Sequence, residues 1–189
     1  MRQFFSFLPL ILLLVACGPE ETSNNANNDA GNNVNNVNNT NNTDVPPDFM
    51  EFPAKVSEIV DGDTIYVRYN EKRFKVRFLG VNTPETYGTV EYYGPEAKQY
   101  TRDKLPLSTW VGLEFDNPAC GSATPPSSCF DMYDRMLAYI RTLENTDHCA
   151  QLVVNGYARV YTDADCDRMT YYLQLQNEAS AANRGLWGE

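Results

Sequence analysis

Three short polar segments hold the side chains best suited to chemistry. They are Asp61-Gly62-Asp63-Thr64, the run Arg77 to Glu85 (RFLGVNTPE) and Asp131-Met132-Tyr133-Asp134-Arg135. Taken singly, each has a structural interpretation: a turn, a capped loop, or a solvated strand face. If folding brings them together, oxygens from Asp63, Asn82 and the Thr83 carbonyl suit Ca²⁺. Two arginines and a carboxylate beside such an ion would suit phosphodiester cleavage.

The segments lie among short strands that would have to position them. Alternating β-branched and aromatic residues predict strands at residues 56–60, 64–69 and 74–79, and two more at 111–115 and 137–142. Proline and glycine signals predict helices at 96–105, 148–155 and 167–183, with Thr146 or Asp147 as a cap. Strands first and helices later indicate an α+β fold, and a small closed barrel is one way to bury such a meander.

Charge and composition exclude several classes of protein. The 189 residues carry a formal charge of −10, and residues 51–189 hold 14 Lys and Arg against 20 Asp and Glu. A protein that coats nucleic acid through overall positive charge is therefore excluded. The chain has one histidine, which excludes paired-histidine phosphotransfer and multi-histidine zinc sites. We expect that histidine, His148, to be a helix-start or surface residue.

The first 50 residues predict export and a flexible tether. Residues 1–17 combine Arg2, a thirteen-residue apolar run and a small residue before Cys17, which is typical of a secretory signal and shorter than the ~20 residues a bilayer span needs. Leu14 to Cys17 resembles a bacterial lipobox with a lipidated cysteine; the alternative is an ordinary signal peptide on a secreted protein. Residues 18–50, with twelve asparagines between 24 and 42, are expected to be a disordered tether. Residues 51–189 then form the folded domain, outside the cytoplasm.

Four cysteines remain after Cys17, and an even number in an exported domain predicts two disulfides with three possible pairings. Adjacency favours Cys120 with Cys129, around a Pro/Ser-rich segment, and Cys149 with Cys166. A zinc site is the weaker alternative, because the chain has no C-x-x-C pair.

Several matches, in order, make residues 53–189 resemble the staphylococcal-nuclease-like, or thermonuclease, family. They are residues 59–64 (IVDGDT), 77–85 (RFLGVNTPE), 90–97 (VEYYGPEA), 133–139 (YDRMLAY), 152–158 (LVVNGYA) and 183–187 (NRGLW). The resemblance implies a five-stranded OB-type β-barrel with three α-helices. It assigns Asp63 and the Thr83 carbonyl to the metal, and Glu85 to the attacking water. By the same resemblance Arg77 and Arg135 bind the phosphate, and Tyr133 contacts the nucleotide.

Departures from the family pattern bear on the expected affinity for Ca²⁺ and substrate more than on the expected hydrolysis. Asn82 stands where the family has a second metal carboxylate, and Asp134 where glycine is found beside Arg135. The loop 86–90 lacks lysines, the tyrosines expected near Tyr161 do not align, and residues 118–128 are an addition, placed by sequence position near the active-site rim. Asp163, Asp165 and Asp167 lack the remaining features of a calcium loop and are interpreted as a turn and helix cap.

The sequence thus predicts a Ca²⁺-dependent, lipid-anchored, extracytoplasmic phosphodiesterase that cuts DNA and RNA as a monomer. By resemblance its products carry 3′-phosphate ends. The rival prediction is an OB-type module that binds single strands without cutting them.

Overall fold

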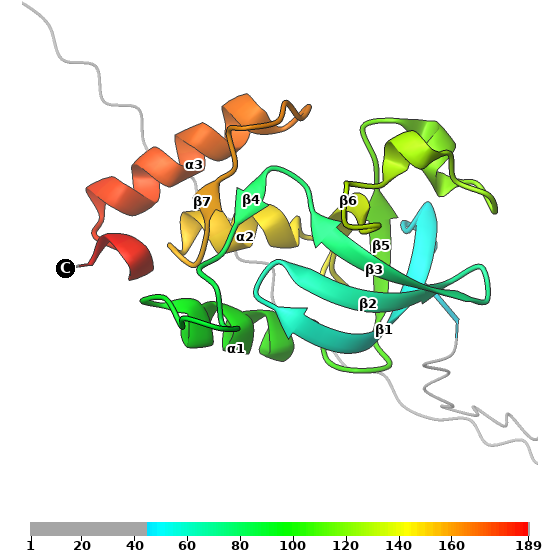
Figure 1. Ribbon diagram of the computed structural model, residues 1–189, viewed down its shortest axis with the longest axis horizontal. Coiled ribbons are helices and arrows are strands. Elements are labelled where there is room, and N and C mark those ends of the chain that lie inside the picture. The colour runs from blue at the N-terminus through cyan, green and yellow to red at the C-terminus, as the bar shows by residue number, and fades with distance from the viewer. Residues whose placement is uncertain (1–44, 189) are drawn as a thin grey trace, which may run out of the picture. The chain divides into compact units, whose positions relative to one another are not determined.

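The computed structural model describes residues 45–188, in which five strands form a closed barrel (Figure 1). Around the barrel the order is β1-β2-β3-β6-β5. All neighbours are antiparallel except β3 and β6, whose parallel pairing places Arg77 opposite Leu137. The strands are β1 (Phe52–Asp61), β2 (Thr64–Tyr69), β3 (Lys72–Phe78), β5 (Trp110–Glu114) and β6 (Met136–Arg141).

Alternation along the strands fills the barrel. Ile65 and Val67 on β2, and Val76 and Phe78 on β3, are buried, whereas their neighbours in sequence point outward. Successive side chains on a strand lie on opposite faces, so this pattern fixes which residues are available to solvent. The α+β prediction of an OB-type barrel is confirmed.

Three helices cover one side of the barrel (Figure 1). They are α1 (Gly94–Lys104), α2 (His148–Val154) and α3 (Met169–Ala181), accompanied by the short pair β4 (Val81–Asn82) and β7 (Arg159–Val160) and by a 3-10 turn, η3 (Gly185–Trp187). The Asp147 side chain caps α2 by accepting from the Ala150 amide at 3.0 Å, as the sequence predicts.

The last helix starts two residues later than expected. Arg168, not an aspartate, stands at the N-cap of α3, and it makes no side-chain capping hydrogen bond. The Asp167 amide instead donates to Asp116. The prediction of an aspartate cap is wrong: Asp167 lies in a turn before the helix, where its amide bonds to Asp116 and Arg168 takes the N-cap position.

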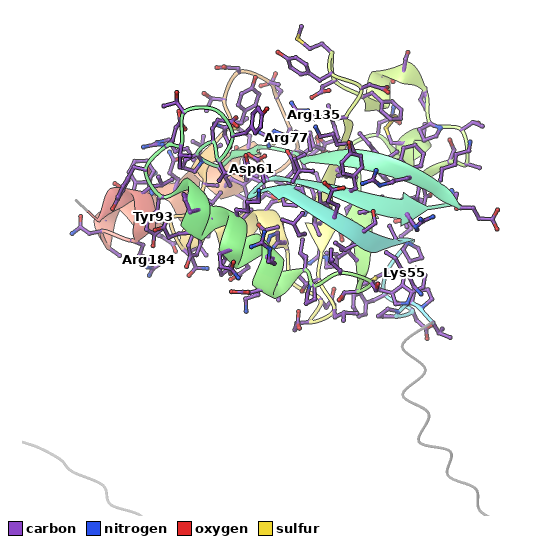
Figure 2. The ribbon with its side chains drawn as sticks, turned by 60° about the horizontal axis from the view of Figure 1, so that its bottom comes forward. Lys55, Asp61, Arg77, Tyr93, Arg135 and Arg184 are labelled. Carbon is purple, nitrogen blue, oxygen red and sulfur yellow. A yellow bond between two sulfur atoms is a disulfide. The ribbon has the colours of Figure 1, made fainter. Side chains whose placement is uncertain are left out.

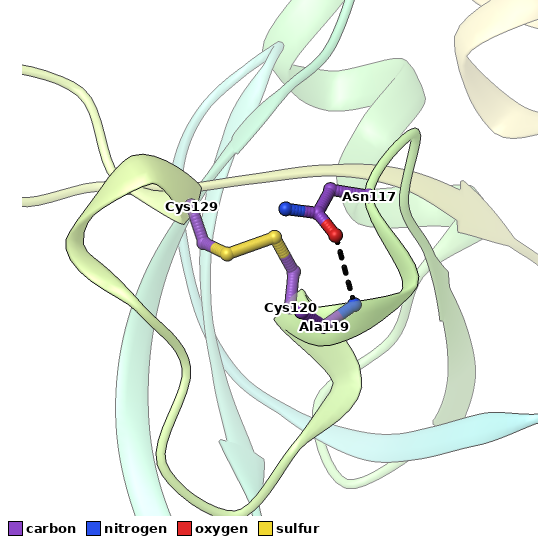
Figure 3. The surroundings of a disulfide bond; sticks show 4 residues. All are labelled: Asn117, Ala119, Cys120 and Cys129. Atoms are coloured by element: carbon purple, nitrogen blue, oxygen red, sulfur yellow. Dashed lines mark hydrogen bonds between the residues drawn. A yellow bond between two sulfur atoms is a disulfide. The ribbon is translucent and has the colours of Figure 1, made fainter.

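A disulfide closes the segment inserted after β5 (Figure 3). Cys120 on the 3-10 turn η1 (Pro118–Gly121) bonds to Cys129 on η2 (Ser127–Cys129). The insertion packs on Phe52, and its Gly121 carbonyl accepts from the Tyr69 hydroxyl. Phe52 and Tyr69 lie at the ends of β1 and β2 remote from the Asp61–Thr64 turn, so the expected place beside the active-site rim is wrong.

The second predicted disulfide is not formed. Cys149 and Cys166 are free thiols, and burial raises the pKa of each. The Cys166 sulfur lies against Gly80, and the ring edge of Tyr172 approaches the same glycine. Two tyrosine hydroxyls bond to nearby carboxylates, Tyr139 to Asp116 and Tyr172 to Asp147. Cys149 is fully buried, whereas Cys166 is half-buried beside Gly80, a difference that adjacency in sequence does not reveal.

Residues 1–17, Cys17 included, and most of the expected tether lie outside the described residues. Met50, the last residue of that tether, is buried and packs near Gly112. Within residues 45–188, no helix has the length and apolar character of a membrane span.

Candidate active site

The turn between β1 and β2 carries Asp63, which is only 6% exposed. Its carboxylate accepts from the Thr64 hydroxyl at 2.9 Å and from the Thr83 amide at 2.8 Å. Gly62 permits this approach, since a Cβ there would lie 2.8 Å from the Thr83 side chain. The turn and the segment after β4 are thereby locked together, with Asp63 between them.

Arg77 points outward from β3 and is fixed by main-chain oxygens. One guanidinium nitrogen donates to the carbonyls of Phe78 (3.0 Å) and Val81 (2.6 Å) and lies 3.3 Å from an Asp63 oxygen. Another nitrogen donates to Oδ1 of Asn82 at 2.8 Å. This network holds the guanidinium at the mouth of the turn without occupying all its donors.

Glu85 follows the short strand β4 and is positioned by its neighbours. Its amide donates to the Glu91 carboxylate at 3.1 Å, and the next residue, Thr86, donates its hydroxyl to Asp61 at 3.0 Å. Gly94 is required nearby, because a Cβ would lie 2.7 Å from the Glu85 carbonyl. Desolvation first, and then the charges of Asp61, Asp63 and Glu91, raise the pKa of Glu85. A carboxylate with a raised pKa is suited to taking a proton.

Arg135 reaches the same site from the segment before β6. Its Nε donates to Asp131 at 2.7 Å, and its amide donates to the other oxygen of that carboxylate at 3.0 Å. Although partial burial opposes the shift, these bonds lower the pKa of Asp131. Asp134, the departure beside Arg135, adopts a left-handed conformation with φ of 58°. Asp131 therefore orients the arginine, a role that sequence reasoning did not assign.

Two adjoining cavities share Arg77, Glu85 and Arg135. The first, about 350 Å³, is also lined by Asp61, Asp63, Lys75, Tyr87 and Lys98. The second, about 440 Å³, is lined by Asn82, Asp131, Met132, Tyr133 and Tyr161, among others. Figure 2 shows Asp61, Arg77 and Arg135 close together, with Lys55 at the other end of the barrel. The three predicted catalytic residues thus lie where the cavities meet, and Tyr133, 70% exposed, lies in the second.

His148 is the first residue of α2, as expected, but it is fully buried, which contradicts the expected place at the surface. Its Nε2 lies 3.1 Å from the Thr101 hydroxyl, and that hydroxyl donates to the Gly62 carbonyl at 2.5 Å. Because the Thr101 hydroxyl donates its only proton to Gly62, it must accept a hydrogen bond from Nε2 of His148. His148 is therefore the neutral tautomer that carries its proton on Nε2. Burial, and then the charge of Lys104, lower the pKa of His148 to about 3. From the start of α2, the histidine thus supports the Asp63 turn through Thr101 of α1.

The predicted metal ligands fit a hard cation in part. Asp63 and Thr83 are adjacent, and the charges of Asp61, Asp63 and Glu91 add to desolvation in raising the pKa of Glu85, so a cation here would meet nearby negative charge. Asn82 fits less well, since its Oδ1 faces Arg77. Within residues 45–188, no group of three or more His, Cys, Asp or Glu side chains forms a metal cluster. A cation here would rely on main-chain, amide and water oxygens as well as Asp63.

Some residues of the site escaped the sequence predictions. Lys75, Lys98 and Tyr87 line the first cavity, and Asp61 ties the Thr86 side chain to the turn. The alternation of apolar and charged residues in 74–78 could have indicated Lys75, because it lies two residues from Arg77 and therefore on the same face of the strand. Nothing local indicates Lys98, which comes from α1.

Comparisons with known proteins agree with this geometry. Residues 75–189 match the family described as "Staphylococcal nuclease homologue". The chain is 30% identical to "Uncharacterized protein MJ1439" of Methanocaldococcus jannaschii, over 99% of this chain and 95% of that protein. It is 37% identical to "Thermonuclease" of Staphylococcus hyicus, over 70% of this chain and 74% of the other. It is also 28% identical to "Endonuclease YhcR" of Bacillus subtilis, where the match covers 74% of this chain and 12% of that protein.

The family match spans more than half of the chain and includes Arg77, Glu85 and Arg135. The barrel, the three helices and the shared position of these residues fit the same assignment. The chain therefore belongs to the staphylococcal nuclease homologue family.

Proposed function

We propose that this protein is a Ca²⁺-dependent phosphodiesterase that cuts DNA and RNA outside the cytoplasm, anchored through Cys17. Nuclease activity is supported by family membership and by relatives named thermonuclease and endonuclease. The endonucleolytic mode and the 3′-phosphate ends rest on the family resemblance, the choice of Ca²⁺ on the oxygen ligands near Asp63 as well, and the lipid anchor on the lipobox-like Leu14 to Cys17. The expected monomer is part of the same proposal.

One observation carries the proposal: Arg77, Glu85 and Arg135 line both cavities. A phosphate placed where the cavities meet would have a nucleotide on each side. Two guanidinium groups and a carboxylate at that point match the requirements of phosphodiester hydrolysis, which are charge stabilisation and a proton acceptor.

Asp63, the Thr83 carbonyl and the side-chain amide oxygen of Asn82 would hold a Ca²⁺ ion. The bound ion would supply positive charge to neutralise a phosphate oxygen. Glu85 would orient a water molecule and accept its proton, for which its raised pKa is suited. Arg77 and Arg135 would donate to the phosphate oxygens as negative charge develops. Their fixed orientation, from main-chain carbonyls and from Asp131, lowers the cost of reorganisation.

The test is digestion of a supercoiled plasmid and of an RNA by purified protein, with Ca²⁺ and with a chelator. We expect Ca²⁺-dependent cleavage of both, and products with 3′-phosphates by end analysis. Arg77→Ala, Arg135→Ala and Glu85→Ala should each lower kcat by ~10²-fold or more, while Glu96→Gln on the exposed start of α1 should leave it unchanged.

Cleavage that persists in chelator would refute the metal dependence. Binding of strands without cleavage under any divalent ion would favour the binding-module interpretation instead.

A further inference from the structure

The outer face of β2 and β3 carries a concentration of positive charge, of which the proposed chemistry uses only Arg77. Residues 64–78 contain five of the fourteen Lys and Arg residues of residues 51–189, and one acidic residue, Glu71. The domain as a whole has an excess of acidic residues. The hairpin is therefore locally basic on an acidic protein.

Strand register places these cations in two neighbouring rows. Arg77, Lys75 and Arg73 alternate with residues that point toward the core, so they share the outer face of β3. The residues paired with them on β2 are Thr64, Tyr66 and Arg68 respectively. At ~3.4 Å per residue, side chains two apart are about 7 Å from each other along the strand. We call Tyr66, Arg68, Arg73, Lys75 and Arg77 the β2–β3 track.

An aromatic ring lies in the middle of the track. The Arg73 guanidinium stacks 3.7 Å from the centroid of Tyr66, and the Lys75 ammonium lies 5.9 Å from it. Glu58 on β1 forms an exposed ion pair with Arg73. Such a pair contributes little to stability, so phosphate oxygens can compete for the arginine.

The track begins inside the candidate active site. Arg77 lies between the two cavities, and Lys75 lines the first of them. From there the row leads away from the Asp63 turn toward the far end of the hairpin, where Lys72 donates to Ala123 of the disulfide-closed insertion. A strand whose phosphate sits at Arg77 would have further cations at regular intervals under its backbone.

We propose that the β2–β3 track binds the extended part of a single-stranded nucleic acid substrate. Lys75 and Arg73 contact successive phosphates along β3, Arg68 contacts a phosphate from the position facing Arg73 on β2, and the Tyr66 ring offers a surface on which a base can stack. A single strand is favoured over a duplex because only unpaired bases can expose their faces to an aromatic ring. This inference rests on the proposed function for the position of the reacting phosphate.

The experiment compares two doubly neutralised proteins with equal net charge. Arg68→Gln/Arg73→Gln removes the distal part of the track, and Arg102→Gln/Lys104→Gln removes two exposed cations from α1. Fluorescence anisotropy with a labelled twelve-nucleotide oligo-dT, in chelator, measures binding without cleavage. We expect affinity on the order of tenfold weaker for the track variant only, and a salt slope smaller by about 1.4, or ~0.7 for each lost phosphate contact.

Two further variants separate binding from folding. Glu58→Gln should tighten binding, because it removes the carboxylate that competes for Arg73. Tyr66→Ala should weaken binding several-fold while Tyr66→Phe retains it, since stacking needs the ring and not the hydroxyl. A tighter complex after Glu58→Gln is an effect that loss of structure would not produce.

Cleavage assays then distinguish failure of the track from failure of the proposed function. The track variant should lose kcat/KM on the twelve-nucleotide substrate and keep it within about twofold on a dinucleotide. Equal losses in both double variants, equal losses on both substrates, or equal loss on a twelve-base-pair duplex would overturn the track. If wild type binds the oligonucleotide through the track and cuts nothing with any divalent ion, the proposed function fails and the track stands.

Discussion

Among the individual residues, Asn82 is predicted to bind the metal, but in the structure its side chain bonds to Arg77. Its Oδ1 accepts from Arg77, and its side chain is exposed. Asn82→Asp would add a negative charge beside Asp63, so we expect roughly tenfold less Ca²⁺ for half-maximal activity. A Ca²⁺ titration of plasmid cleavage measures this.

The matched control is Asn70→Asp, the same change in charge at the β2–β3 turn remote from Asp63. An unchanged Ca²⁺ requirement in Asn82→Asp would mean that residue 82 does not contact the ion.

His148 makes stability depend on pH in a predictable direction. Its pKa is about 3 in the folded protein and near 6.5 when unfolded, so the unfolded state binds the proton first as pH falls. Its contribution is complete above pH 6.5 and is lost progressively toward pH 3. Between pH 7.5 and pH 5 we expect the free energy of unfolding to fall by about 2 kcal/mol on account of this residue.

Urea unfolding of wild type and His148→Gln at both pH values measures that difference. Glutamine keeps a donor for Thr101 and does not titrate, so the carboxylates common to both proteins cancel. Equal pH dependence in the two proteins would show that His148 is not buried in neutral form.

At the scale of elements, one disulfide closes the insertion and two thiols stay free. The loop between Cys120 and Cys129, nine residues apart, should stabilise the domain by about 2 to 3 kcal/mol in the chain-entropy model. Cys120→Ser/Cys129→Ser should lower the free energy of unfolding by that amount while leaving dinucleotide cleavage intact, because the insertion lies away from Asp63.

Thiol titration of the denatured, unreduced Cys17→Ser protein should detect two thiols, those of Cys149 and Cys166. Zero thiols would restore the second predicted bridge.

For the molecule as a whole, we expect the location of the protein to depend on the first 17 residues. The lipobox-like Leu14 to Cys17 predicts lipidation after cleavage of the signal. Cys17→Ser should move the protein out of the membrane fraction and leave cleavage activity unchanged, which fractionation followed by plasmid digestion would show. Retention of the variant in membranes would contradict a lipid anchor.

The strands, the helices and their order could be predicted from the sequence alone, because alternation selects strands and Asp147 caps a helix. Local patterns left a closed barrel as one possibility, and they gave each of the segments that hold Arg77, Glu85 and Arg135 a purely structural alternative. The family resemblance supplied roles that the spacing of residues alone left open.

Contacts between segments far apart in the sequence could be seen only in the tertiary structure. In the structure, His148 is buried and supports Gly62 through Thr101, and Cys149 and Cys166 remain free thiols. The insertion lies at the end of the barrel remote from Asp63. The tertiary fold also brought Lys98 from α1 to the cavity that Arg77 lines and directed Asn82 toward that arginine. Local sequence encodes periodicity and caps, whereas these contacts join segments up to 52 residues apart, and their geometry is set by how the barrel closes.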